Sequence, residues 1–257
     1  MYLEKYDLTG KVAVVTGGGR AIGLACSQAL AEAGARVVIA DCDPETAAEG
    51  QAELARAGLQ VETIPLDVTK PDQVTAAAKQ IVADHGGIDI LVNNAGIARS
   101  GVPAEEVTDE HWRNVIDVNL NGVFWCCRAF GGHMLASGKG AIVNIGSMSG
   151  FIVNKPQEQS FYNASKAAVH HLTKSLAAEW GPRGVRINAV APTYIETPLT
   201  RFGMDDPELY PVWLENTPMR RVGQPDEIAS VVLFLASDAA SLMTGSIVLA
   251  DGGYTCW

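Results

Sequence analysis

The chain has 257 residues, of which 47% are apolar and 19% are charged, as is typical of a soluble globular protein with one large core. A formal net charge of −10 without a basic run argues against nucleic acid and anionic membranes as partners. No apolar stretch reaches the roughly 18 residues of a membrane span.

The N-terminal residues lack the cationic and apolar regions of a signal peptide. The five cysteines show neither metal-ligand nor disulfide spacing: Cys26, Cys42, Cys126, Cys127 and Cys256. We therefore expect small buried cysteines, no metal site and a cytoplasmic location.

Short Val- and Ile-rich runs alternate with alanine-rich amphipathic stretches along the chain. The run at 12–15 precedes a helix expected over 20–33, and further helices are expected over 44–57, 109–136 and 160–180. The apolar runs lack polar alternation, which indicates strands covered on both faces of a parallel sheet. Seven strands with six crossovers predict an α/β fold: a single Rossmann-type doubly wound domain with a seven-stranded parallel sheet and helices on both faces.

The first of these turns, VVTGGGRAIG at 14–23, connects a strand to a helix through glycines, as in dinucleotide-binding proteins. Asp41 ends the next strand, where its carboxylate can accept hydrogen bonds from the adenosine ribose. It would repel a 2′-phosphate about 4 Å away by ~4 kcal/mol, so we expect NAD, although Arg20 could flank such a phosphate. Ala21 occupies the place of a third glycine, and at a positive φ it would cost on the order of 1 kcal/mol.

Tyr162 and Lys166 lie four residues apart on a helical pattern and so share one face of the helix. A nearby ammonium stabilises a phenolate and lowers its pKa, which would make Tyr162 a general base. Such a pair alone is usually a solvated helix face. Ser147, however, ends the preceding strand at the carboxyl edge of the sheet, next to the expected cofactor, and this favours a catalytic site.

These motifs resemble those of the short-chain dehydrogenase/reductase family over essentially the whole chain. TGGGRAIG at 16–23 resembles the family's TGxxxGxG loop, NNAG at 93–96 its sheet-stabilising motif, and YNASK at 162–166 its YxxxK active site. Asn119 in DVNLNG matches the family's helix asparagine, and VRINAVAP and LADGG match later landmarks.

The resemblance implies a role for each matched residue. Tyr162 would remove the substrate's hydroxyl proton, Lys166 would hold the nicotinamide ribose, and Ser147 would orient the reacting oxygen. Asn119 would support a water in the proton path. The implied cofactor site comprises Gly17, Arg20, Ala21, Ile22, Gly23, Asp41, Asp67, Val68, Asn94, Ala95, Gly96, Tyr162, Lys166, Pro192, Ile195 and Thr197, with Thr193 replacing a common glycine.

Within the family, GSMSGFIVNKPQEQSFYNASK looks similar to the corresponding stretch of galactitol-type polyol dehydrogenases. This similarity implies oxidation of a sugar alcohol to a ketose by NAD. The implied substrate site comprises Ser147, Ser149, Asn154 and Tyr162, whereas Gln157 and Glu158 are evenly balanced between pocket and solvent. One alternative is a reductase of 3-oxoacyl thioesters, which Asp41 and the acidic balance disfavour. The other is a nucleotide-sensing regulator, which would tolerate loss of the serine, tyrosine or lysine.

The whole chain, 1–257, is expected to be one NAD-binding catalytic domain, in which the proline-rich segment 193–225 follows a strand's carboxyl end. We expect this segment to be a partly helical substrate lid; the alternative is a passive surface loop. The resemblance also implies a homotetramer. We expect Trp112, Phe124 and Trp125 to lie in the core or an interface, and His170 and His171 to lie at the surface or a subunit contact rather than on a metal.

Overall fold

The computed structural model describes residues 1–98 and 100–257. Seven strands form one sheet in the order β3-β2-β1-β4-β5-β6-β7, and every neighbouring pair is parallel. The strands are β1 (Val12–Thr16), β2 (Arg36–Asp41), β3 (Val61–Pro65), β4 (Ile90–Asn93), β5 (Gly140–Ile145), β6 (Val185–Pro192) and β7 (Ile247–Ala250). The predicted doubly wound fold is thereby confirmed.

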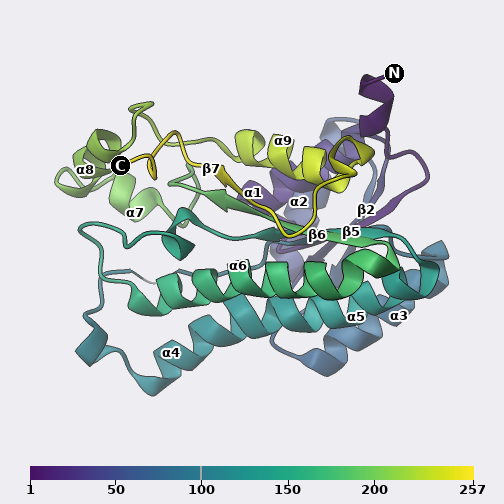
Figure 1. Cartoon of the computed structure of the whole chain (residues 1–257), viewed down its shortest axis with the longest axis horizontal. Coiled ribbons are helices and arrows are strands. Elements are labelled where there is room, and N and C mark those ends of the chain that lie inside the picture. The colour runs from purple at the N-terminus through teal and green to yellow at the C-terminus, as the bar shows by residue number, and fades with distance from the viewer. Residues whose placement is uncertain (99) are drawn as a thin grey trace.

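Two layers of helices cover the sheet. The α-helices are α1 (Ala21–Glu32), α2 (Pro44–Arg56), α3 (Pro71–His85), α4 (Asp109–Ile116), α5 (Gly122–Ser137), α6 (Ser160–Trp180), α7 (Arg201–Met204), α8 (Leu209–Asn216) and α9 (Pro225–Ala236). Figure 1 shows α3, α5 and α6 below the sheet, with α1 and α9 above it. One apolar core joins the sheet to α3, α5 and α6, and a second joins it to α1, α2 and α9.

Local sequence explains where many of these helices begin and end. Proline occupies the first turn of α2, α3 and α9, where a missing N–H costs nothing. The Asp43 carboxylate accepts a hydrogen bond from the Glu45 N–H and caps α2. Gly86 and Gly138 end α3 and α5 in the left-handed conformation that suits glycine.

The long helix expected over 109–136 is formed, but not as one regular α-helix. A π-helical segment at Asp117–Asn121 separates α4 from α5. π-Helical turns inside α-helices are frequent at functional sites, and this one carries Asn119. Hydrophobic periodicity predicted the helix but could not predict the π-helical turn within it.

The cysteines are not all buried. Cys26, Cys126 and Cys127 are in the core, but Cys42 and Cys256 are exposed, so the expectation is wrong for these two. Cys42 directly follows β2, where the chain leaves the sheet, and Cys256 is the penultimate residue. Across residues 1–98 and 100–257, no helix is long and apolar enough to cross a membrane, and no three His, Cys, Asp or Glu residues group as metal ligands would.

Candidate active site

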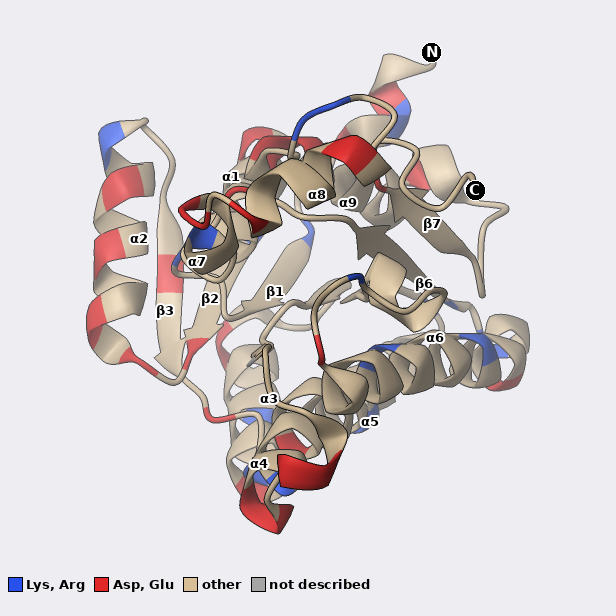
Figure 2. Cartoon of the chain, turned by 90° about the vertical axis from the view of Figure 1, so that its left-hand side faces the viewer, with Lys and Arg blue, Asp and Glu red and all other residues tan. Residues whose placement is uncertain are grey.

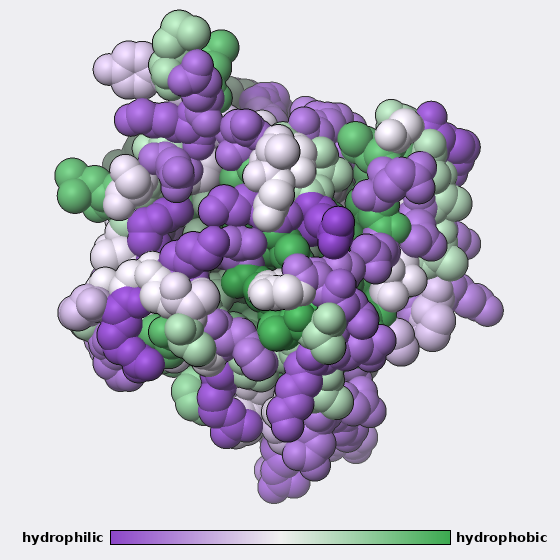
Figure 3. Space-filling view, turned by 90° about the vertical axis from the view of Figure 1, so that its right-hand side faces the viewer, coloured by the Kyte–Doolittle hydropathy of each residue, from purple (hydrophilic) through white to green (hydrophobic). Residues whose placement is uncertain are grey.

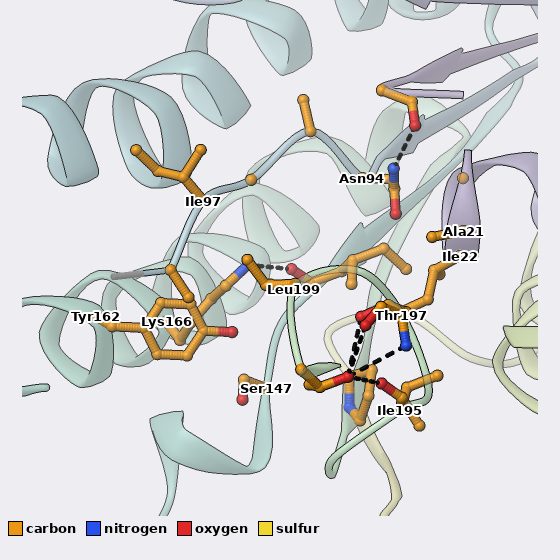
Figure 4. A pocket seen from close by; sticks show the side chains of 18 of the residues that line it. Ala21, Ile22, Asn94, Ile97, Ser147, Tyr162, Lys166, Ile195, Thr197 and Leu199 are labelled. Carbon is orange, nitrogen blue, oxygen red and sulfur yellow. Dashed lines mark hydrogen bonds between the residues drawn. The ribbon is translucent and has the colours of Figure 1, made fainter. Parts of the chain in front are cut away.

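A cavity of about 520 Å³ lies at the carboxyl ends of the strands. β1 pairs with both β2 and β4, so the loops after β1 and β4 diverge there and leave a crevice, as open α/β sheets do at such a point. The predicted residues that line it are Gly17, Arg20, Ala21, Ile22, Gly23, Asp41, Asp67, Val68, Asn94, Ala95, Gly96, Ser147, Ser149, Asn154, Tyr162, Lys166, Pro192, Ile195 and Thr197. Figure 4 shows several of them converging from different elements.

The glycine loop is shaped by its backbone. Gly17 has a φ of +60°, and a Cβ on Gly23 would overlap the carbonyl oxygen of Gly17. The Asn94 side chain donates hydrogen bonds to the carbonyl oxygens of Thr16 (3.0 Å) and Gly17 (2.9 Å), which ties the loop to the end of β4. The first turn of α1, with Ala21 and Ile22, therefore opens onto the cavity.

Ala21 has a φ of +49°, in the left-handed region. The strain anticipated for alanine in this loop is therefore present, at about 1–2 kcal/mol for a residue with a Cβ. Only one other non-glycine residue among those described, Arg220, has a positive φ. The loop thus keeps the conformation that a glycine would adopt freely.

Carboxylates gather at the end of β2. Asp41 is 8% exposed; its Oδ2 accepts a hydrogen bond from the Gly19 N–H (3.4 Å) and its Oδ1 accepts one from the Asp43 N–H (3.1 Å). Burial raises the pKa of the Cys42 thiol, and the negative charges of Asp41, Asp67 and Asp43 raise it further. This end of the cavity is therefore a region of negative potential. Figure 2 shows acidic residues along the neighbouring α2 as well.

Three residues with catalytic potential meet across β5 and α6. Ser147 follows β5, while Tyr162 and Lys166 lie on one face of α6, as their spacing predicted. The Lys166 ammonium is buried, donates a hydrogen bond to the Ile145 carbonyl oxygen (2.8 Å) and lies 5.7 Å from the centre of the Tyr162 ring. In Figure 4 all three side chains lie on the same side of the cavity.

Burial controls the proton affinities of this pair. It raises the pKa of the Tyr162 phenol, whereas hydrogen bonding with the Ser147 hydroxyl acts in the opposite direction. Burial also lowers the pKa of Lys166 to about 8. The anticipated lowering of the tyrosine pKa by the ammonium is not found, because the loss of hydration disfavours the charged form of both groups.

Asn119 is the one predicted site residue that does not line the cavity. Its side chain is fully buried: Oδ1 accepts a hydrogen bond from the Ile97 N–H (2.8 Å), and Nδ2 donates to the Ile97 carbonyl (2.9 Å) and to the Ser165 hydroxyl (3.1 Å). These contacts fasten the loop after β4 to α6. Because the side-chain oxygen and nitrogen are engaged in this way, a water in the proton path would have to contact the backbone of Asn119.

A group of hydrogen-bonded polar side chains, here called the polar wall, also lines the cavity and comprises Ser149, Asn154 and Gln159. Asn154 is 5% exposed; its Nδ2 donates to the Tyr194 hydroxyl (3.0 Å), and its Oδ1 accepts from Gln159 Nε2 (2.9 Å). Gln159 is also within 3.5 Å of the Ser149 hydroxyl, which accepts a hydrogen bond from Ser147 Oγ (3.0 Å). The wall is therefore connected to the serine of the catalytic group.

Gln157 and Glu158, which the sequence left undecided between pocket and solvent, lie in different environments. Gln157 lines the cavity, and its Oε1 accepts hydrogen bonds from the Tyr194 hydroxyl (2.7 Å) and from Trp213 Nε1 (3.0 Å). Glu158 is exposed and lines only a smaller neighbouring cavity. The sequence did not single out Gln159, Tyr194 or Trp213; aromatic residues in the proline-rich segment 193–225 were the available signal for the last two.

The segment 193–225 contributes α7, α8 and several lining residues. Tyr194 stacks on Trp213 with ring centres 3.8 Å apart and planes 4° apart, and Trp213 is 1% exposed. A small apolar cluster around this stack attaches the segment to Met148 and Tyr254. Thr193 also lines the cavity, and its hydroxyl is buried without a partner among the described residues. The lining residues from this segment are Thr193, Tyr194, Ile195, Thr197, Pro198, Leu199, Thr200, Phe202 and Trp213.

Several residues expected at the surface or in the core lie elsewhere. His171 is exposed, but His170 is 5% exposed and packs under the turn that carries Ser147, so the surface expectation is wrong for His170. Trp112 and Phe124 are 44% and 36% exposed, which excludes the core of this chain for both. On the face drawn in Figure 3, hydrophobic residues form small groups separated by hydrophilic ones.

Comparisons with known proteins agree on one family. The family model described as "Enoyl-(Acyl carrier protein) reductase" matches residues 17–255. Galactitol 2-dehydrogenase of Rhizobium johnstonii is 57% identical over 256 residues, covering 100% of this chain and 99% of the relative. Galactitol 2-dehydrogenase (L-tagatose-forming) of Cereibacter sphaeroides is 50% identical over 256 residues, with the same coverage.

Solved structures give the same result. The crystal structure of gox2181 matches with a TM-score of 0.98 and 58% identity, and each chain is covered to 100%. A gluconate 5-dehydrogenase from Burkholderia cenocepacia, in complex with NADP and tartrate, matches with a TM-score of 0.95 and 38% identity, again with 100% of each chain covered.

Proposed function

The chain belongs to the short-chain dehydrogenase/reductase family, and we propose that it interconverts a secondary hydroxyl of a sugar alcohol and the corresponding ketose with NAD as cofactor. The observation that carries this proposal is the convergence of Ser147, Tyr162 and Lys166 on a cavity that the glycine loop and the polar wall also line. The chain is an oxidoreductase; its substrate and cofactor are the proposed part.

The residues at the glycine loop fit a dinucleotide. Gly17 and Gly23 allow a tight turn in which a Cβ on Gly23 would overlap the Gly17 carbonyl oxygen, and the N-terminus of α1 attracts a pyrophosphate. When bound, NAD supplies the acceptor for the hydride that leaves the carbinol carbon. Lys166 would hold the ribose next to the nicotinamide, and the backbone around Pro192 and Ile195 would border the ring.

The protein's own task in the reaction is to position an oxygen and move a proton. Tyr162 Oη would accept the hydroxyl proton, and Ser147 Oγ would hold the same oxygen by a hydrogen bond as it becomes a carbonyl. Burial raises the pKa of Tyr162, so deprotonation of the phenol depends on contacts made in the loaded site. General-base catalysis of this kind contributes about 10²–10⁴-fold.

The choice of NAD over NADP rests on charge. A 2′-phosphate on the adenosine ribose would lie next to the buried Asp41 and close to Asp43 and Asp67. Arg20 offers one opposing charge at the start of α1. Three carboxylates against one guanidinium favour a ribose with free hydroxyls, although the gluconate 5-dehydrogenase relative binds NADP.

The polar wall supports a polyol substrate. Ser149, Asn154 and Gln159 hydrogen-bond one another, and a chain of hydroxyls can join such a network whereas an acyl chain cannot. The names of the two galactitol 2-dehydrogenase relatives point to the same class. A reductase of 3-oxoacyl thioesters would need a more apolar wall. A nucleotide-sensing regulator would not need the complete set of serine, tyrosine and lysine.

A turnover assay tests this proposal. Galactitol, other hexitols, pentitols, vicinal diols and a 3-oxoacyl thioester are offered with NAD(H) or NADP(H), and formation or loss of reduced cofactor is followed by absorbance. We expect five- and six-carbon polyols with NAD to react best and vicinal diols more weakly. A faster thioester reaction would overturn the substrate class, and NAD binding without any turnover would favour a regulator.

We also propose that the chain assembles as a homotetramer. Exposed apolar side chains support self-association, among them Trp112, Phe124, Leu242 and Trp257. Sedimentation of the purified protein measures the assembly, and a monomer at micromolar concentration would contradict it.

A further inference from the structure

His170 lies on α6, one turn beyond Lys166, and its imidazole is enclosed by the turn that carries Ser147. A Cβ on Gly146 would overlap its Nε2, and a Cβ on Gly150 would overlap its Cε1. The Phe151 ring covers it, with ring centres 4.6 Å apart. The whole turn from residue 146 to residue 151 therefore wraps around this one side chain.

The imidazole makes a directed contact with that turn. The Ser147 N–H donates a hydrogen bond to His170 Nε2 (3.4 Å). Nε2 can accept only in the neutral ring with its proton on Nδ1. Burial, with smaller contributions from Lys166 and Lys174, lowers the pKa of His170 to about 4, which keeps the ring neutral at physiological pH.

The Ser147 side chain is hydrogen-bonded next to this contact. With its N–H held by His170, Ser147 keeps Oγ in hydrogen bonds with the Ser149 N–H (3.1 Å) and the Ser149 hydroxyl (3.0 Å). His170 and Tyr162 belong to the same helix, so the histidine connects the position of the serine to that of the tyrosine.

We infer that His170 is a positioning residue: its Nε2 accepts the Ser147 N–H and so holds Ser147 Oγ in register with Tyr162 and Lys166 on α6. The inference deepens the proposed function and rests on it. A histidine that only filled space could be replaced by any side chain of similar volume. A positioning histidine requires a hydrogen-bond acceptor at the place of Nε2.

Two substitutions separate these roles. In His170→Gln the side-chain oxygen can reach the place of Nε2, whereas His170→Leu keeps an apolar volume and removes the acceptor. A displacement of about 1 Å in a reacting group can cost about a hundredfold in rate. We therefore expect His170→Leu to lower kcat ten- to a hundredfold, with the Kd for NAD within twofold of the wild type. His170→Gln should stay within about threefold in kcat, and the exposed neighbour His171→Gln serves as the matched control.

Equal losses of kcat in His170→Leu and His170→Gln would overturn the inference in favour of packing, and so would an unchanged kcat in His170→Leu. If His170→Leu does not fold, His170→Asn takes its place, because its amide is one methylene too short to reach the Ser147 N–H. Hydrogen exchange of peptides covering 146–151 gives a second readout that needs no turnover. Exchange should be faster in the Leu or Asn variant than in His170→Gln and the wild type, and equal rates in all of them would overturn the inference. A wild type that oxidises no polyol removes the proposed function, while the exchange rates still decide the role of His170.

Discussion

The two sides of the cavity are built in different ways. The cofactor side, formed by the loops after β1 and β2, depends on backbone: a φ of +60° at Gly17, no room for a Cβ on Gly23, and backbone N–H groups held by Asp41. The substrate side depends on side chains that pair with one another, such as Asn154 with Tyr194. The cofactor side should therefore be sensitive to added atoms, and the substrate side to lost polar partners.

Helix α6 carries Tyr162 and Lys166, the proposed catalytic pair that acts on both the cofactor and the substrate. Tyr162 and Lys166 face the cavity, while the buried Ser165 and His170 connect the helix to the loop after β4 and to the turn after β5. The contrast between the two sides can be examined by changing one of these three regions at a time and measuring cofactor binding and turnover separately.

The largest effect is expected from Tyr162→Phe, which removes the proton acceptor and keeps the ring. Turnover should fall by about 10³-fold, within the range of general-base catalysis, because the phenylalanine ring has no atom that can take the proton. The Kd for NAD, measured by tryptophan fluorescence, should change by less than twofold. Tyr6→Phe is the control, because Tyr6 precedes β1, packs against Phe234 and does not line the cavity. Retained turnover in Tyr162→Phe would mean that another group carries the proton.

The next effect concerns the substrate side alone. Asn154→Leu leaves the Tyr194 hydroxyl and the Gln159 amide each without one partner, and a buried polar group without a partner costs about 1–3 kcal/mol. KM for a hexitol should rise about ten- to a hundredfold. KM for a simple secondary alcohol, which needs no second hydroxyl contact, should rise less than threefold, and the Kd for NAD should not change.

Melting temperature controls for the fold of this variant. If KM rises equally for the hexitol and the simple alcohol, Asn154 has no part in recognising the polyol. If the Kd for NAD also rises, the substrate side influences cofactor binding, and the two sides of the cavity do not act independently.

The same contrast explains what the sequence predicted. The glycine loop and the Tyr162–Lys166 pair are each encoded within a few neighbouring residues, and Asp41 was recognised because it ends a strand, so local pattern was enough to single them out. The alternation of strands and helices predicted the fold. Tyr194 bonds to Asn154 40 positions away, and Trp213 bonds to Gln157 56 positions away. Pairings at such distances follow from tertiary packing, which a single sequence does not specify.

His170 was misjudged for a related reason. A histidine beyond the catalytic lysine can lie on the solvent side of a helix or under a neighbouring turn. Gly146 and Gly150 on a different element make room for it. The π-helical turn at Asn119 is a similar case. The Asn119 side chain bonds to Ile97 on a different element, and hydrophobic periodicity does not predict such a turn.

Asp41→Ala tests the charge argument on the cofactor side. Removing the carboxylate removes repulsion of a 2′-phosphate, so the ratio of kcat/KM with NAD to that with NADP should fall about tenfold. It also frees the Gly19 N–H, so affinity for NAD should weaken modestly. Glu45→Gln, an exposed acid in the first turn of α2, is the matched control and should leave the ratio within twofold. A wild type that already prefers NADP would contradict the argument before any substitution is made.

The smallest effect is expected from Ala21→Gly, and it examines the backbone side most directly. Glycine removes the strain of about 1–2 kcal/mol that alanine bears at a φ of +49°, but it also loses more conformational freedom on folding, by about 0.5–1 kcal/mol. The two nearly offset each other in the free energy of folding, so the loop should keep its conformation and affinity for NAD should change less than tenfold, or under ~1.4 kcal/mol. Gly23→Ala in the same loop is the opposite case, because its Cβ would overlap the Gly17 carbonyl, and NAD binding should be lost. Loss of NAD binding in Ala21→Gly instead would mean that the Ala21 methyl itself contributes to the site. The loop would then depend on a side chain, as the substrate side does.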